Sequence, residues 1–94
     1  NKPARSKDLH HAVVSEVKAC AQANALNFLE PHLTDSERDI VRKGRNRAGR
    51  GPRKVDAAIY GMATGFESMV GWLFLKDPAR LAHLFDQLQG ISSL

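Results

Sequence analysis

The sequence is poor in the features that mark several common classes of protein. It has a single cysteine, Cys20, which leaves no intrachain disulfide framework and no cysteine-based zinc site. The longest strongly apolar stretch, residues 69–75, is far shorter than the ~20 residues of a membrane span, so we expect no transmembrane helix. The four histidines do not form the spaced pairs of metal sites, and no serine has the setting of a nucleophile elbow. The single cysteine fits a reducing compartment. The spacing of the histidines and the setting of the serines give no support to zinc-dependent or serine-type chemistry.

Acidic residues are missing from one long segment, and this absence polarises the chain. No acid lies between Asp39 and Asp56, whereas seven of the fourteen basic residues do. The formal charge of the whole chain is +4, and removing these seven cations leaves −3 on the remainder. We therefore predict that the partner of this segment is a polyanion. The seven cations are Arg42, Lys43, Arg45, Arg47, Arg50, Arg53 and Lys54.

The basic segment is predicted to be a loop, because Gly44, Gly49, Gly51 and Pro52 interrupt residues 44–55. Guanidinium groups contact phosphate oxygens bidentately, and glycines let backbone N–H groups approach phosphates. The loop contains no aromatic residue for base stacking, so contact with the backbone of a duplex is favoured over reading of splayed bases. A solvated loop without a ligand is the alternative. A role at a membrane surface is disfavoured, because the segment lacks an apolar face.

Sustained alternation of period two is also absent, so the fold class is predicted to be all-α. Apolar spacing predicts a first helix that begins near residue 7, after the cap Ser6-Lys7-Asp8. It ends at Glu30-Pro31, because proline disfavours α geometry at the preceding residue. Whether this is one helix or two, broken near residues 15–18, is left open.

Three further helices are predicted from their start signals. Thr34 and Glu37 form a capping box before a short helix over residues 35–43. Asp56 caps a long helix that ends near Lys76 and is apolar almost all round, as a central buried helix is. Asp77-Pro78 begins a last helix that ends before Gly90.

The predicted central helix carries a stripe of smaller and polar residues. Tyr60, Thr64, Glu67 and Gly71 recur at three- and four-residue steps, so they share one face. A carboxylate inside an apolar helix needs a partner, which is either an arginine or hydroxyl elsewhere in the fold or a metal ion. The hydroxyls of Tyr60, Thr64 and Ser68 could orient that carboxylate or a metal-bound water. Glycines at 65 and 71 predict a close approach by another helix or by a ligand.

Several motifs, in order, resemble one known family. Lys2-Pro3 with Asp8-Leu9-His10 looks like K-P-x-x-L-H, and residues 17–23 look like V-S-A-K-x-Q-A. Residues 42–46 are similar to R-R-G-R-N, and residues 52–56 stand where the pattern has P-K-N-x-D. Residues 60–73 look like Y-x-x-[SA]-T-A-F-E-A-L-[IL]-G-[YW]-L. Together they resemble mini-ribonuclease III, a short relative of ribonuclease III without a separate double-stranded-RNA-binding domain.

The resemblance implies an activity and a set of site residues. Glu67 would be the catalytic, Mg²⁺-binding glutamate of an endonuclease that cleaves double-stranded RNA, and Thr64 stands where mini-ribonucleases commonly have threonine. The family is homodimeric and typically matures large-subunit ribosomal RNA precursors. Bacterial cytoplasm is the expected location, with plastids as the alternative. The residues expected to bind RNA are Arg42, Lys43, Arg45, Asn46, Arg47, Arg50, Arg53 and Lys54.

One family element has no counterpart in the sequence. The L-G-D-A helix, whose aspartate is the second essential metal ligand, would precede the segment that resembles K-P-x-x-L-H. We therefore expect residues 1–94 to be the C-terminal two-thirds of a single ribonuclease III helical bundle, inactive alone. The alternative is a module that keeps the fold and binds structured RNA without cutting it.

Overall fold

The computed structural model describes residues 17–92, and every regular element within them is helical. The all-α class is therefore confirmed. Residues 17–29 are helical and lead into a 3-10 turn, η1, at Pro31, as the proline predicts. The predicted cap at Ser6-Lys7-Asp8 lies outside the described residues. The elements that follow the first helix are η1 (Glu30–His32), α2 (Asp35–Ala48), α3 (Ala57–Lys76) and α4 (Pro78–Ser92).

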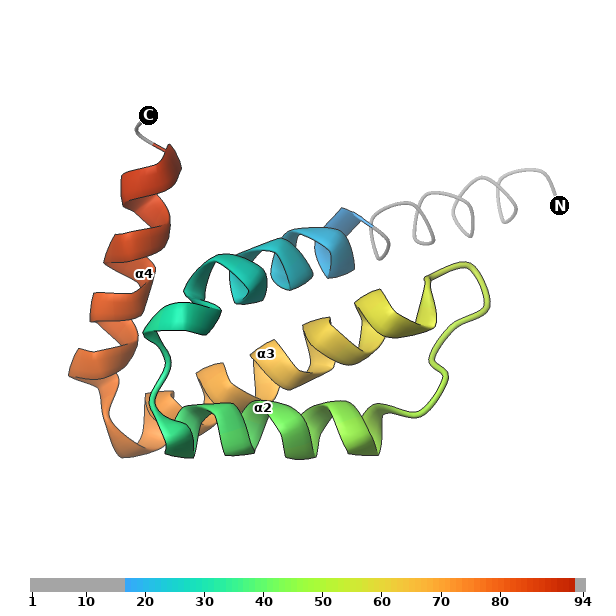
Figure 1. Ribbon diagram of the computed structural model, residues 1–94, viewed down its shortest axis with the longest axis horizontal. Coiled ribbons are helices and arrows are strands. Elements are labelled where there is room, and N and C mark those ends of the chain that lie inside the picture. The colour runs from blue at the N-terminus through green and yellow to red at the C-terminus, as the bar shows by residue number, and fades with distance from the viewer. Residues whose placement is uncertain (1–16, 93–94) are drawn as a thin grey trace, which may run out of the picture.

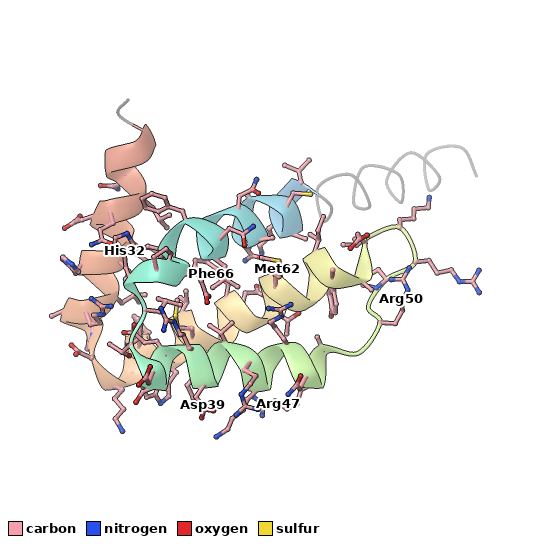
Figure 2. The ribbon with its side chains drawn as sticks, viewed as in Figure 1. His32, Asp39, Arg47, Arg50, Met62 and Phe66 are labelled. Atoms are coloured by element: carbon pink, nitrogen blue, oxygen red, sulfur yellow. The ribbon has the colours of Figure 1, made fainter. Side chains whose placement is uncertain are left out.

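The helices are arranged around α3 (Figure 1). In this view α3 lies between the helical residues 17–29 and α2, and α4 stands across the end opposite to the α2–α3 loop. Figure 2 shows Met62 and Phe66 of α3 in the space between these helices. Burial of such apolar surface away from water makes the largest favourable contribution to the stability of a helical bundle. The principal core comprises Leu26, Leu29, Leu33, Val41, Phe66, Met69, Leu73, Leu81 and Leu84.

The predicted helix starts are confirmed atom by atom. The Thr34 hydroxyl accepts from the Glu37 N–H at 3.2 Å, and the Glu37 carboxylate accepts from the Thr34 N–H at 2.8 Å. Asp56 caps α3, and its Oδ1 accepts from the N–H of Ala58 at 2.9 Å. Asp77 does the same for α4. Each cap satisfies N–H groups that have no partner within the helix and contributes roughly 1 kcal/mol.

The predicted end of α2 at Gly44 is wrong, because the helix continues to Ala48. Gly44 is buried where α2 meets α3, and a Cβ there would lie 2.5 Å from the Ser68 hydroxyl oxygen. Gly65 is the reciprocal position, since its Cβ would lie 2.7 Å from the Val41 carbonyl oxygen. These two glycines permit close helix packing. The helix instead ends at Gly49, whose positive φ of 67° is one that glycine adopts readily.

The prediction that α3 is a central helix buried on all sides is wrong. Phe74 and Leu75 are 66% and 84% exposed, and Glu67 is exposed as well. Gly65 has the predicted close neighbour, but a Cβ at Gly71 would meet no atom within 4 Å among the described residues. The last helix runs past Gly90 to Ser92. The apolar residues of α3 therefore lie on two faces of the helix. Other helices cover only one of these faces in the described part of the chain.

Candidate functional site

A groove of about 190 Å³ lies between the helical residues 17–29 and the first half of α3. Its walls come from three segments of the chain that are distant in sequence. The helices supply most of its polar side chains, and the α2–α3 loop supplies an apolar edge. The residues that line it are Lys18, Ala19, Gln22, Pro52, Val55, Tyr60, Ala63, Thr64 and Glu67.

The structure brings together the predicted stripe of α3 on this groove. Tyr60 and Thr64 are half-buried, and Glu67 is exposed at the same wall. The groove continues past Glu67 into a second hollow of about 420 Å³, which Gly71 also lines. Ser68 does not belong to it, because its hydroxyl donates to the Thr64 carbonyl at 2.9 Å and its side chain faces Gly44 of α2. The prediction of Ser68 as a donor beside Glu67 is therefore wrong.

Glu67 is not the buried carboxylate that the apolar sequence around it predicted. It is exposed, and its side chain forms no hydrogen bond or ion pair with any residue in the 17–92 range. Its two lone-pair-bearing oxygens are therefore available to a ligand or a metal ion. Because Glu67 is exposed, water can solvate its carboxylate, and the burial argument for a partner, whether arginine, hydroxyl or metal ion, no longer applies.

Two residues of the groove are not among the predicted site residues, although both lie in the segment 17–23 that resembles a family motif. Lys18 and Gln22 line both hollows together with Glu67. They lie four residues apart, so they share a face of the first helix. The signal that could have found them is their position beside Ala19, Ala23 and Leu26, which form the buried face of this helix. A lysine at this place supplies positive charge next to the free carboxylate of Glu67.

A buried carboxylate does exist, and it is Glu37. Its side chain is 2% exposed and receives the Arg80 guanidinium at 2.8 Å and 3.0 Å. Arg80 also donates to the main-chain carbonyl of His32 at 2.8 Å. The hydrogen bond from Arg80 holds the pKa of Glu37 below its usual value. Glu37 therefore joins the start of α2 to α4, a pairing that no local sequence pattern indicated.

The helical half of the basic segment is partly neutralised by its own acid. Arg42 and Lys43 both reach Asp39, with Lys43 Nζ 3.1 Å from Oδ2. The hydrogen bond from Arg42 is the largest cause of the lowered pKa of Asp39. Figure 2 shows Asp39 on the side of α2 that faces away from the first helix. These two cations are therefore less available to a polyanion than the sequence suggested.

The remaining residues of α2 in this segment are free. Arg45, Asn46 and Arg47 are exposed and form no hydrogen bond or ion pair within the described part of the chain. Arg45 and Asn46 line a polar hollow of about 290 Å³ with Arg38. Figure 2 shows Arg47 near the end of α2. The donors of these three side chains are therefore not occupied by the described residues.

The loop half contains three exposed cations, of which Arg50 alone forms hydrogen bonds within the described residues. Arg53 and Lys54 are exposed and unpaired in the structure as described. The Arg50 guanidinium instead donates to main-chain carbonyls of its own loop, at Pro52, Arg53 and Val55. Figure 2 shows Arg50 in the loop that joins α2 to α3. The basic segment is thus half helix and half ordered loop.

The described residues contain no full metal site. No group of three or more His, Cys, Asp or Glu side chains gathers anywhere in residues 17–92. Glu67 offers the hard oxygen donors that Mg²⁺ prefers, with hydroxyls at Tyr60 and Thr64 on the same groove. The donors therefore fit Mg²⁺ in kind, although one carboxylate alone would hold it weakly.

No helix among residues 17–92 combines the length and the apolar character that crossing a membrane requires.

Comparison with known proteins places the chain in a family. The profile of the ribonuclease III domain matches residues 1–78. A mini-ribonuclease 3 of Thermosynechococcus vestitus is 46% identical over 94% of this chain and 58% of its own length. A mini-ribonuclease 3 of Gloeobacter violaceus is 47% identical over 93% of this chain and 67% of its own length. No solved structure matches the chain significantly. The chain is therefore a member of the ribonuclease III family, similar to the mini-ribonuclease 3 proteins and spanning about three-fifths of their length.

Proposed function

We propose that the protein acts as an Mg²⁺-dependent endoribonuclease on double-stranded RNA, with Glu67 as its catalytic and metal-binding residue. The observation that carries this proposal is the state of Glu67, an exposed carboxylate without a protein partner on the wall of a groove. The one buried carboxylate among the described residues, Glu37, is paired with Arg80 instead. Glu67 also lies in the segment that resembles the family motif, and family membership supports the same reaction class.

Glu67 would hold Mg²⁺ through its carboxylate oxygens, and Tyr60 and Thr64 would orient that carboxylate or a water molecule beside it. The bound ion would activate water and stabilise negative charge on the scissile phosphodiester. Lys18 lines the groove beside Glu67, where its ammonium group can hold a phosphate oxygen near the carboxylate. A further carboxylate ligand, from residues that the structure does not describe or from flanking sequence, would complete the site.

Duplex RNA is the proposed substrate because the free cations form a surface for a phosphate backbone. Arg45, Asn46 and Arg47 on α2 and Arg53 and Lys54 on the loop are exposed and unpaired in the described chain. Contacts of this kind position a duplex without reading its sequence. Arg42 and Lys43 would join them only when they leave Asp39. Precursors of large-subunit ribosomal RNA, in bacterial cytoplasm or plastids, are the proposed natural substrate.

A homodimer is the proposed assembly. Phe74 and Leu75, at the end of α3, expose apolar side chains that a second copy could cover. Duplex cleavage requires a cut in each strand, which a pair of sites provides. That residues 1–94 form the C-terminal two-thirds of one domain, and that they are inactive alone, remain predictions.

The experiment compares wild type with Glu67→Gln, expressed with the coding sequence that flanks residues 1–94 in the gene. Each protein is incubated with Mg²⁺ and a duplex precursor RNA, and the cut ends are mapped. We expect wild type to cleave and Glu67→Gln to lose roughly 100-fold or more in rate, because the substitution removes a charged metal ligand. Equal cleavage by the two proteins would remove Glu67 from the mechanism.

A binding module without catalysis is the second candidate, and the single carboxylate at the groove favours it. It predicts salt-sensitive binding of duplex RNA by wild type and no cleavage at any Mg²⁺ concentration. The sequence upstream of Asn1 in the gene separates the candidates. An L-G-D-A-like helix there favours the enzyme, and a gene without one favours the binder.

A further inference from the structure

The α2–α3 loop, residues 49–56, is built around one side chain. Arg50 Nη1 donates to the carbonyls of Pro52 at 3.2 Å and Val55 at 3.0 Å. Its Nη2 donates to the carbonyl of Arg53 at 3.3 Å. The Val55 N–H closes the same turn on the Pro52 carbonyl at 3.3 Å. A planar guanidinium with several donors can bridge three carbonyls, whereas an ammonium group has no such fork.

The loop is also fixed against α3. Gly51 has a φ of 75°, and a Cβ there would lie 2.3 Å from the Tyr60 ring, so the backbone rests directly on that ring. Val55 is 4% exposed and belongs to a small apolar cluster with Ala19 and Ala63. The loop therefore packs against residues of the groove through Gly51 and Val55, and the hydrogen bonds of Arg50 hold its turn together.

This arrangement determines one wall of the groove. Pro52 and Val55, whose carbonyls Arg50 bridges, line the groove together with Tyr60, Thr64 and Glu67 of the polar stripe. Arg53 contributes its carbonyl to the bridge, while its side chain remains exposed. The guanidinium of Arg50 thus donates to its own loop although the residue is exposed, whereas the side chains of Arg53 and Lys54 form no contact within residues 17–92.

We propose that Arg50 is a positioning residue, which holds the Pro52–Val55 edge of the groove that Glu67 also lines and so places the scissile phosphate, rather than a phosphate contact. This proposal rests on the proposed ribonuclease function of the same groove. Its consequence is a division of labour among neighbouring arginines. Loss of Arg50 impairs the chemical step, whereas loss of Arg47 weakens phosphate affinity.

The test uses three variants of the full natural chain. Arg50→Ala removes the bridge and the charge, Arg50→Lys keeps the charge and removes the fork, and Arg47→Ala is the matched control that removes a free cation. Hydrogen exchange at the Val55 amide is measured without RNA. Single-turnover cleavage and the salt dependence of duplex binding are measured with it.

We expect both Arg50 variants to exchange the Val55 amide about tenfold faster or more, because loss of the bridge opens the turn. We expect their cleavage rate constants to fall about 10- to 100-fold, because a misplaced phosphate reacts slowly. The salt slope of Arg50→Lys should equal that of wild type. Arg47→Ala should keep wild-type exchange and lower the slope by about 1.

Two results would overturn the proposal. Wild-type exchange and cleavage in Arg50→Lys would show that charge at this position is sufficient. A salt slope lowered in Arg50→Ala as much as in Arg47→Ala, with unchanged cleavage at saturating RNA, would make Arg50 a phosphate contact. If wild type itself cuts no RNA, the proposed function fails on its own, and unchanged exchange in both Arg50 variants would separately reject the loop bridge.

Discussion

Glu37 and Glu67 occupy opposite environments in one small bundle. Glu37 is 2% exposed, accepts hydrogen bonds from Thr34 and Arg80, and has a lowered pKa. Glu67 is exposed on a groove and has no partner among residues 17–92. A buried carboxylate must have its oxygens satisfied by the protein, whereas a carboxylate that binds a ligand must keep them free. The comparison assigns Glu37 to the fold and supports the proposal that Glu67 serves the chemistry.

The largest stability effect should come from breaking the buried pair. Glu37→Gln removes the charge that Arg80 meets and leaves that guanidinium only 24% exposed and without an ionic partner. We expect the free energy of unfolding to fall by about 2 to 4 kcal/mol, because one member of a buried pair is left uncompensated. Urea denaturation followed by circular dichroism measures this change.

The matched control for that variant is Glu30→Gln. Glu30 is exposed and meets Arg38 only at 3.9 Å, so its loss should cost less than about 0.5 kcal/mol. If both variants lose the same stability, burial does not distinguish Glu37 from an ordinary surface glutamate.

Acid should weaken the same contact. Hydrogen bonding from Arg80 lowers the folded-state pKa of Glu37 below its unfolded value of about 4.3. Its contribution to stability is therefore complete above the unfolded pKa and is lost as pH falls through the lower folded pKa. Melting temperatures of wild type and Glu37→Gln, measured from pH 6 to pH 3, should converge toward the acid end. Parallel curves would show that Glu37 titrates alike in both states.

Two glycines sharpen the contrast between covered and open faces. Gly44→Ala should destabilise the protein by about 1 to 3 kcal/mol, because its Cβ would lie 2.5 Å from the Ser68 hydroxyl. Gly71→Ala should stabilise it by about 0.5 to 1 kcal/mol, because alanine favours helix and meets no described atom. Thermal unfolding of the two variants tests both signs. A destabilised Gly71→Ala would show that sequence outside residues 17–92, or a second copy, packs on this face.

The smallest effect on folding should follow loss of the free cations. Arg45→Ala with Arg47→Ala should leave the melting temperature nearly unchanged, because exposed side chains contribute little to stability. The log–log salt slope of duplex binding should fall by about 1 to 2, since fewer phosphates are neutralised. Arg42→Ala is the comparison, and its effect should be smaller because Arg42 is already paired with Asp39. A double mutant with the wild-type slope and affinity would place the RNA elsewhere.

The parts of this structure that the sequence predicted depend on near neighbours. The predicted helix starts are correct because a capping side chain and the N–H groups that it accepts from lie within three residues. The capping residues are Thr34 with Glu37, Asp56, and Asp77 with Pro78. The stripe from Tyr60 to Glu67 shares a groove wall for the same reason, since helical spacing alone determines it.

The parts that the sequence missed depend on how helices meet. Glu37 and Arg80 are 43 residues apart, and only the tertiary fold brings the first turn of α4 to the start of α2. Gly44 is predicted from the sequence to end a helix, yet the structure shows that glycine is needed there because Ser68 of α3 leaves no room for a Cβ. The charge of Arg50 is visible in the sequence and predicts a phosphate contact, whereas the loop carbonyls to which it donates become visible only in the fold.

The most direct measurement of the division between the two glutamates places Glu67→Gln and Glu37→Gln side by side. Both are expressed with their natural flanking sequence, and each is assayed for melting temperature and for Mg²⁺-dependent cleavage of duplex RNA well below its transition. We expect Glu67→Gln to melt as wild type does and to lose roughly 100-fold or more in cleavage rate. We expect Glu37→Gln to melt earlier and to cleave within a few-fold of wild type while folded. Wild-type cleavage by Glu67→Gln, or a melting temperature lowered as far as that of Glu37→Gln, would contradict the assignment of Glu67 to chemistry.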